Sequence, residues 1–347
     1  MFALLGLTPG LFALFVVFGF MVGVFFGFFG MGGSFLVTPA LLILGYSAPV
    51  AIGSSMAFVF GTAVIATMKH HDSGQVDYRL GALMFVGIAL GIEAGSRLVF
   101  GLEVLGIAEA VVGIAYVVVL AAIGLLFTRS ALNDAAEDGD GADGDSNDDP
   151  GGPSGDDDVP AIAQTIQSYE VPPMMTLADG QRASLWTISG VSAGVGVVSG
   201  FLGVGGGFVR MPAIYYVIGT SLAAAVGTSL FTGLLSGGVG AFTYGRAGVI
   251  DLGIVTALLL GSALGARIGS GATAYVNEDD VTIYFGLMLL VASVAVALGE
   301  AAAWLSRPVL DQVSFVLLVG SALFVCAIIL YHGALAVRQD RGPSTSS

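Results

Sequence analysis

Apolar runs of about 20 residues recur along the whole chain, and they constrain its fold more than any other feature. A helix of this length crosses the hydrocarbon core of a bilayer. Only 10% of the 347 residues are charged and 56% are hydrophobic, whereas a soluble domain carries roughly 25% charged residues. So few polar residues could not cover a soluble helical bundle. The sequence therefore predicts an all-α polytopic membrane protein.

Two glycine-rich stretches interrupt these runs. Residues 28–41 (FFGMGGSFLVTPAL), here termed the first break, match residues 201–214 (FLGVGGGFVRMPAI), the second break, at seven of fourteen positions when shifted by 173 residues. Glycine loses the most backbone entropy in a helix interior, and proline lacks the donor N–H. At membrane depth, irregular backbone is tolerated only where it is buried in protein or lines a polar cavity.

The similarity extends beyond the two breaks. At an offset of 174 residues, Gly53-Ser54-Ser55 matches Gly227-Thr228-Ser229, and Asp77 matches Asp251. Three glycines spaced by four also match at this offset: Gly87, Gly91 and Gly95 with Gly261, Gly265 and Gly269. Small residues on one helix face allow close helix–helix approach in lipid. We therefore predict two homologous repeats, each with a glycine-broken half-helix, and expect Asp77 and Asp251 to cap the helices that follow them.

The apolar pattern predicts about nine transmembrane spans and two half-helices. The half-helices are expected to start at Pro39 and Pro212, because proline suits the first turn of a helix. The spans are expected at about residues 11–29, 50–68, 80–100, 105–127, 185–202, 222–242, 252–272, 281–303 and 313–337.

Composition divides the chain into four parts. The first transmembrane repeat is expected at residues 1–127 and the second at 184–304, and an extra span and tail at 305–347 has no counterpart. Residues 128–183 form the predicted linker. Its first part, up to residue 160, is rich in Asp, Gly, Ser and Pro, so it cannot bury a core and is expected to be disordered. The remainder is expected to be a partly ordered surface segment.

The pair of breaks suggests an anion site. A helix N-terminus exposes unpaired N–H groups and carries a partial positive charge, and matching interrupted helices in two repeats point to a transporter's binding site. Two such ends that face each other would bind an anion without a buried lysine. The competing interpretation is that the glycines only permit tight packing. The candidate substrate-binding residues are Gly30, Gly32, Gly33, Ser34, Thr38, Ser54, Ser55, Gly203, Gly205, Gly206, Gly207, Arg210, Thr228 and Ser229.

Charges within the apolar spans are expensive and by default suggest function. Arg210, which stands where the first repeat has Val37, is a candidate anion contact; the alternative is an arginine that snorkels to the interface. Arg267 stands where the first repeat has Glu93. Glu93 could instead form an i, i+4 ion pair with Arg97.

No enzyme, cofactor or metal pattern is visible. His70, His71 and Asp72 have no third ligand at a diagnostic spacing, and Cys326 has no second cysteine. The second break lacks the lysine of a phosphate loop. The net charge of −14 disfavours nucleic acid as a partner. The acidic, lysine-poor surface resembles proteins of salt-rich cytoplasms, so we hypothesise a halophilic source.

The paired breaks resemble those of the TauE/SafE sulfite exporter family, in which each half opens with a GxxGxGGG-like break followed by an apolar segment with proline. Here Gly27–Ser34 leads to Pro39, and Gly200–Gly207 leads to Pro212. The Gly-Thr-Ser segment at 227–229 is also similar. The resemblance implies a permease for sulfur-containing or organic anions such as sulfite or sulfonates. The acidic linker and the unmatched last span depart from the simplest plan of that family.

The leading hypothesis is a secondary transporter of the cell membrane that works by alternating access at a site between the two half-helices. A coupling proton or sodium ion is left open. The alternative is a non-transporting membrane sensor or scaffold with the same fold. An intramembrane enzyme has no support, because no catalytic constellation is visible.

Overall fold

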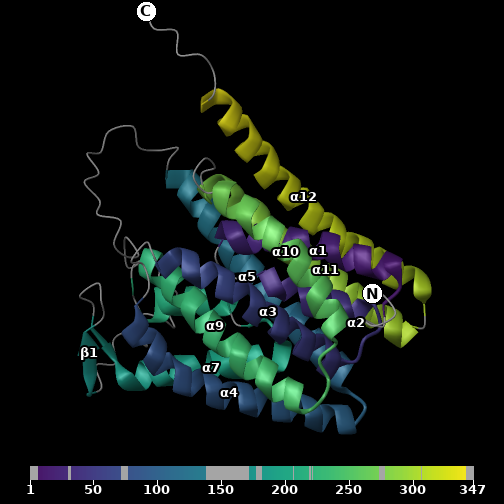
Figure 1. Cartoon of the computed structure of the whole chain (residues 1–347), viewed down its shortest axis with the longest axis horizontal. Helices are drawn as coiled ribbons and strands as arrows, with labels where there is room; N and C mark the ends of the chain where they lie inside the picture. Colours follow the sequence, from purple (N-terminus) through teal and green to yellow (C-terminus); the bar gives the residue numbers. More distant parts are fainter. Residues whose placement is uncertain are drawn as a thin grey trace, which may run out of the picture.

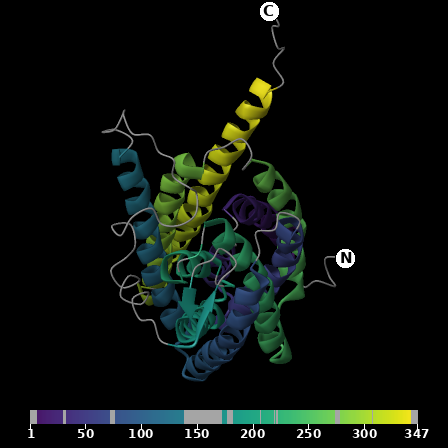
Figure 2. The same cartoon turned by 90° about the vertical axis from the view of Figure 1, so that its left-hand side faces the viewer.

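The computed structural model describes residues 7–29, 33–71, 77–137, 172–176, 182–205, 207–218, 220, 222–272, 278–305 and 307–340. Long helices run side by side and form an elongated bundle (Figures 1 and 2). Among the described residues, seven helices are long and apolar enough to cross a membrane: α1, α4, α5, α7, α10, α11 and α12. Each of them coincides with a predicted span. The all-α class is confirmed apart from one short hairpin, and the predicted count of nine spans is not.

The first half of the chain begins with α1 (Pro9–Phe29). Beyond the first break, a 3₁₀ turn, η2 (Gly33–Leu36), leads directly into the short helix α2 (Val37–Ile43). The half-helix therefore starts before Pro39, where it was predicted. Pro39 still lies in the first turn, where its missing N–H costs nothing because that turn has no intrahelical acceptor.

Three long helices complete the first half: α3 (Ala48–His71), α4 (Tyr78–Val104) and α5 (Ala108–Glu137). The prediction of disorder from residue 128 is wrong for residues 128–137, which continue α5. Once a helix is nucleated, each added residue costs little, and the alanines of this segment favour helix. The rest of the acidic linker, residues 138–171, lies outside the described residues.

Strands β1 (Met174–Thr176) and β2 (Arg182–Ser184) pair antiparallel and precede the second half. Helix α7 (Leu185–Leu202) leads to the second break, after which come the short helix α8 (Gly207–Pro212) and one π-helical turn, η3 (Ala213–Ile218). The prediction that this half-helix starts at Pro212 is wrong. Proline ends α8 instead, because it lacks the N–H that would continue the α-helical ladder, and the backbone widens into the π turn.

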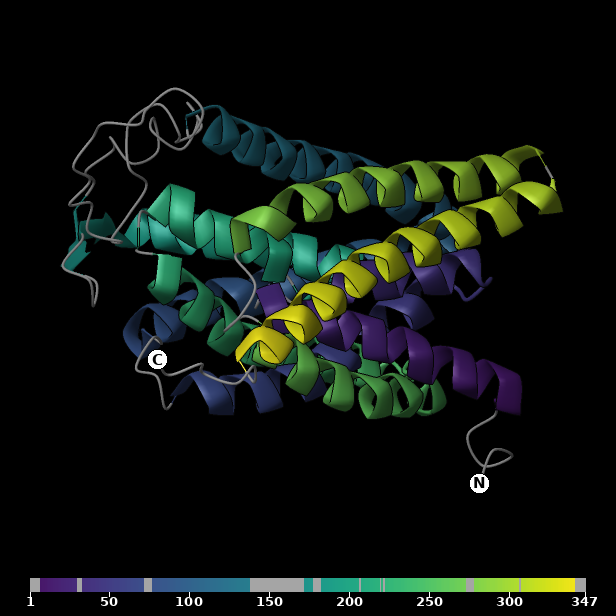
Figure 3. The ribbon, with the colours of Figure 1, turned by 90° about the horizontal axis from the view of Figure 1, so that it is seen from above.

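Four long helices follow: α9 (Leu222–Arg246), α10 (Leu252–Ala272), α11 (Glu278–Leu305) and α12 (Pro308–Asp340). Helices α11 and α12 lie side by side along one flank of the bundle (Figure 3). Helix α12 is the extra C-terminal span that the sequence predicted without a counterpart in the first half.

The two halves pack by exchanging helices. Helix α1 packs most closely on α10 of the other half, and α7 packs most closely on α4. A Cβ at Gly23 would lie 2.5 Å from the carbonyl of Ser262, and one at Gly196 would lie 2.5 Å from the carbonyl of Ile88. Both contacts are backbone to backbone, so only glycine fits. The two pairs are related by the offsets at which the sequence matches, although the duplication itself stays a prediction.

Candidate functional site

The structure brings the two breaks into direct contact. The Ser34 hydroxyl donates to the carbonyl of Val204 at 2.5 Å. A Cβ at Gly203 would lie 2.9 Å from the hydroxyl oxygen of Thr38. Residues about 170 positions apart therefore share one buried region. The candidate residues Gly30, Gly32 and Gly206 lie outside the described residues, and so does the side-chain environment of Gly33.

Two glycines set the backbone of the second break. Gly203, which caps α7, has a φ of 73°, and Gly205 has a φ of 58°. Both values lie in the left-handed region that side chains with a Cβ rarely adopt. A Cβ at Gly203 would also meet Ile52 of α3 at 2.8 Å, and one at Gly205 would overlap Val59. The second break thus turns sharply while lying against α3.

The carbonyl end of α7 is satisfied by two tyrosines from other helices. The Tyr116 hydroxyl of α5 donates to the Leu202 carbonyl, and the Tyr244 hydroxyl of α9 donates to the Gly200 carbonyl at 2.6 Å. Both tyrosines are fully buried. A helix that ends inside a bilayer needs such donors, because no water is available there. The sequence analysis missed them; an isolated tyrosine within an apolar span was the available signal.

Ser54 and Thr228, matched in the sequence, serve helix starts rather than an open site. The Asp77 N–H donates to the Thr228 hydroxyl and the Asp251 N–H donates to the Ser54 hydroxyl, each at 3.0 Å. Both aspartates cap their helices as predicted: Asp77 accepts from Arg79 and Leu80, and Asp251 from Gly253 and Ile254. Each half therefore helps to hold the start of a helix in the other half.

The neighbouring serines behave differently. Ser55 and Ser229 are 0% and 1% exposed, and among the described residues neither hydroxyl has a hydrogen-bond partner. An unsatisfied buried hydroxyl costs about 1–3 kcal/mol. The two serines are equivalent at the 174-residue offset. Ser229 is the one that borders a cavity.

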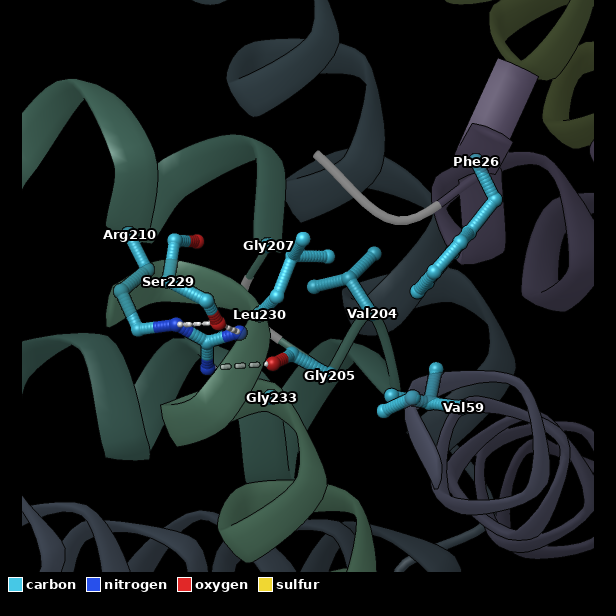
Figure 4. Close-up of a pocket in the computed structure, with 10 residues that line it drawn as sticks. Phe26, Val59, Val204, Gly205, Gly207, Arg210, Ser229, Leu230 and Gly233 are labelled. Carbon is cyan, nitrogen blue, oxygen red and sulfur yellow. Dashed lines mark hydrogen bonds between the residues drawn. The ribbon is translucent and has the colours of Figure 1, made fainter. Parts of the chain in front are cut away.

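Arg210 is the most buried charge in the described part of the chain, with 2% of its surface exposed. Its Nε and Nη2 donate to the Ser229 carbonyl at 3.1 and 2.8 Å, and its Nη1 donates to the Gly205 carbonyl at 2.8 Å and to the Ser236 hydroxyl at 3.0 Å (Figure 4). An arginine buried to this degree does not snorkel, so that alternative is wrong. Ser236 was not a sequence candidate, and only its hydroxyl on an apolar helix marked it.

The charge of Arg210 has no acidic partner among the described residues. The ion pairs found there join Glu93 to Arg97, as predicted, and Glu93 to Arg246, both at 3.0 Å. Arg267 is exposed on α10, away from this region. Four of the five guanidinium N–H groups are taken by carbonyls and a hydroxyl, which solvate the positive charge without neutralising it.

A cavity of about 10 Å³ lies beside the guanidinium, space for about one water molecule. We term its two sides the polar wall and the apolar wall. The polar wall consists of Gly205, Gly207, Arg210, Ser229 and Gly233, and the apolar wall of Phe26, Val59, Ala63, Val204 and Leu230. Figure 4 shows the guanidinium on one side and Phe26 and Val59 on the other. The candidates Gly205, Gly207, Arg210 and Ser229 therefore meet at one place.

The predicted pair of facing helix N-termini is only partly visible at this cavity. The start of α8, at Gly207, lines it, whereas Ser34 and Thr38 lie at the contact between the breaks and do not line it. Phe26, from the last turn of α1, is the lining residue nearest to the first break. Within the described residues, no group of three His, Cys, Asp or Glu side chains could hold a metal ion.

Comparison with known proteins adds independent information. A family model described as "Sulfite exporter TauE/SafE" matches residues 15–296. A probable membrane transporter protein of Xylella fastidiosa (strain 9a5c) is 25% identical over 285 residues, which cover 80% of this chain and 92% of that protein. The probable membrane transporter protein YunE of Bacillus subtilis (strain 168) is 22% identical over 289 residues, 80% of this chain and 94% of that protein. No solved structure matches the chain.

These matches agree with the seven apolar helices and point to a multi-pass membrane transporter rather than an enzyme. The match also extends across both breaks and the helices between them. Because the family model covers most of its length, this chain belongs to the TauE/SafE sulfite exporter family.

Proposed function

We propose that the protein is a secondary transporter of the cell membrane that moves sulfur-containing or organic anions, such as sulfite or sulfonates, through the cavity beside Arg210. The observation that carries this proposal is a guanidinium buried at the second break with no acidic partner among the described residues. The family name supports an anionic sulfur compound as the substrate.

The energetics favour an anion at this place. Removing a charge from water costs several kcal/mol unless a counter-charge compensates it. Two carbonyls and one hydroxyl stabilise the guanidinium in part. A purely structural staple between the second break and α9 could use a neutral donor at lower cost. A bound anion would supply the missing counter-charge, and the free Ser229 hydroxyl would donate to it.

The cavity size suggests how transport proceeds. A space for about one water molecule cannot hold an oxyanion with several heavy atoms. We therefore interpret the structure as an occluded state without substrate. Alternating access would open the cavity toward one side and then the other, by movement of the two predicted repeats across the glycine-lined contacts that join them.

Flux into proteoliposomes tests the proposal, with sulfite and small sulfonates as substrates and with and without imposed proton and sodium gradients. Arg210→Gln should lower flux at least about tenfold, the value of one lost charge-assisted hydrogen bond. Arg267→Gln, on an exposed arginine, is the matched control and should transport normally.

Arg210→Lys keeps the charge and should retain part of the flux, which separates loss of charge from loss of folding. Absence of flux for every anion with folded wild-type protein would refute the proposal and favour a membrane sensor or scaffold. Wild-type flux in Arg210→Gln would move the site away from this cavity.

A further inference from the structure

The cavity beside Arg210 is divided into two chemically different ends. At one end stand the guanidinium and the unpartnered Ser229 hydroxyl. At the other end, Phe26, Ala63 and Leu230 form a small apolar cluster that is separate from the main core, and each is at most 4% exposed. A cavity for a purely inorganic oxyanion would have donors around it, because every oxygen of such an ion needs a hydrogen bond when it is desolvated.

The charge count at the cavity is equally specific. Arg210 contributes one positive charge, and no other charged side chain lines the cavity among the described residues. A monoanion would bring the local charge to zero. A dianion would leave one negative charge uncompensated inside the membrane, and an uncompensated buried charge is strongly destabilising.

We infer that the substrate is a monovalent anion with a small apolar group, whose oxyanion head binds Arg210 and Ser229 while the apolar group packs on Phe26, Ala63 and Leu230. This inference rests on the proposed function and narrows it to one class of anion. The head can be a sulfonate or a carboxylate, since both accept hydrogen bonds from a guanidinium. Inorganic sulfate and doubly charged organic anions are then poor substrates.

Competition for transport in proteoliposomes tests the charge requirement. Ethanesulfonate and ethane-1,2-disulfonate share a carbon skeleton and differ in charge, and sulfate is the inorganic dianion. We expect ethanesulfonate to be preferred over both dianions by at least about 100-fold, the value of one unpaired buried charge. Propionate and succinate repeat the comparison with a carboxylate head and show which head the site prefers.

The apolar group is tested by chain length. Ethanesulfonate should be preferred over methanesulfonate about fourfold, the value of one buried methylene. In Leu230→Asn this preference should disappear while transport of methanesulfonate persists. Val59→Thr, an isosteric change in the same wall, serves as a second variant if Leu230→Asn fails to fold.

The outcomes separate the two proposals. Equal transport of dianions and monoanions would overturn the charge inference and leave a transporter in place. A preference for methanesulfonate over ethanesulfonate, or one unchanged in both wall variants, would overturn the assignment of the apolar group. Transport of no anion at all would instead refute the proposed function.

Discussion

Gly233 of α9 controls how the guanidinium of Arg210 fits beside the cavity. A Cβ added at Gly233 would lie 2.8 Å from Nη2 of Arg210, which is 0.6 Å short of the 3.4 Å at which ordinary contact begins. The guanidinium cannot simply retreat, because four hydrogen bonds hold it. Gly233→Ala should therefore displace Nη2 from the cavity and from the Ser229 carbonyl.

The expected magnitude follows from one lost hydrogen bond to a charged group, about 1.5–3 kcal/mol. That energy corresponds to a rise in the KM for anion transport of about 10- to 150-fold. Stability should change less, because alanine in place of glycine in a helix interior returns up to about 1 kcal/mol. The assay is the concentration dependence of anion flux in proteoliposomes, together with thermal unfolding in detergent.

Gly245→Ala is the matched control in the same helix. Its added Cβ would meet only Cδ1 of Ile250 at 3.4 Å, an ordinary contact. Both variants share the gain in helix propensity, so a rise in KM confined to Gly233→Ala isolates the guanidinium. If folded Gly233→Ala transports with the wild-type KM, Nη2 does not take part in binding and our account of the cavity is incorrect.

Two further predictions concern contacts between the halves. Thr228→Val leaves the buried Asp77 N–H without its acceptor and should lower the free energy of unfolding by about 1–3 kcal/mol, whereas Thr228→Ser should not. Equal unfolding midpoints for both variants would contradict this role. Glu93→Gln removes ion pairs with two arginines that are 56% and 77% exposed, so unfolding should change by less than about 1 kcal/mol. A loss above about 3 kcal/mol would show that these pairs are stronger than exposed pairs usually are.

The sequence alone determined the membrane class and most of the spans. Apolar runs of bilayer length leave few alternatives, because backbone groups in lipid must be satisfied within a helix or a barrel. Local signals were also sufficient for short-range contacts. The cap at Asp77 and the ion pair of Glu93 with Arg97 involve residues at most four positions apart, and both are confirmed. The two breaks were visible as well, since glycine and proline act locally.

Helix starts near the breaks were less predictable. Proline at position 212 looked like the first residue of a half-helix, and the structure places it at the end of α8. The short helix is supported from outside, by Arg210 bonds to the carbonyls of Gly205 and Ser229. In a helix of this length, local preference is weak and tertiary contacts decide where it begins.

Only the tertiary structure decided which hydroxyls and charges belong together. Ser54 and Ser55 are adjacent in the sequence and of one type, yet the first accepts from Asp251 and the second has no partner among the described residues. The partners of Arg210 span residues 205–236, and Tyr116 reaches across to α7. Such contacts depend on how helices distant in sequence are placed, because helix periodicity fixes only the face on which a side chain lies. The sequence thus determined that two broken helices exist, and the packing of the halves decided that one buried arginine stands where they meet.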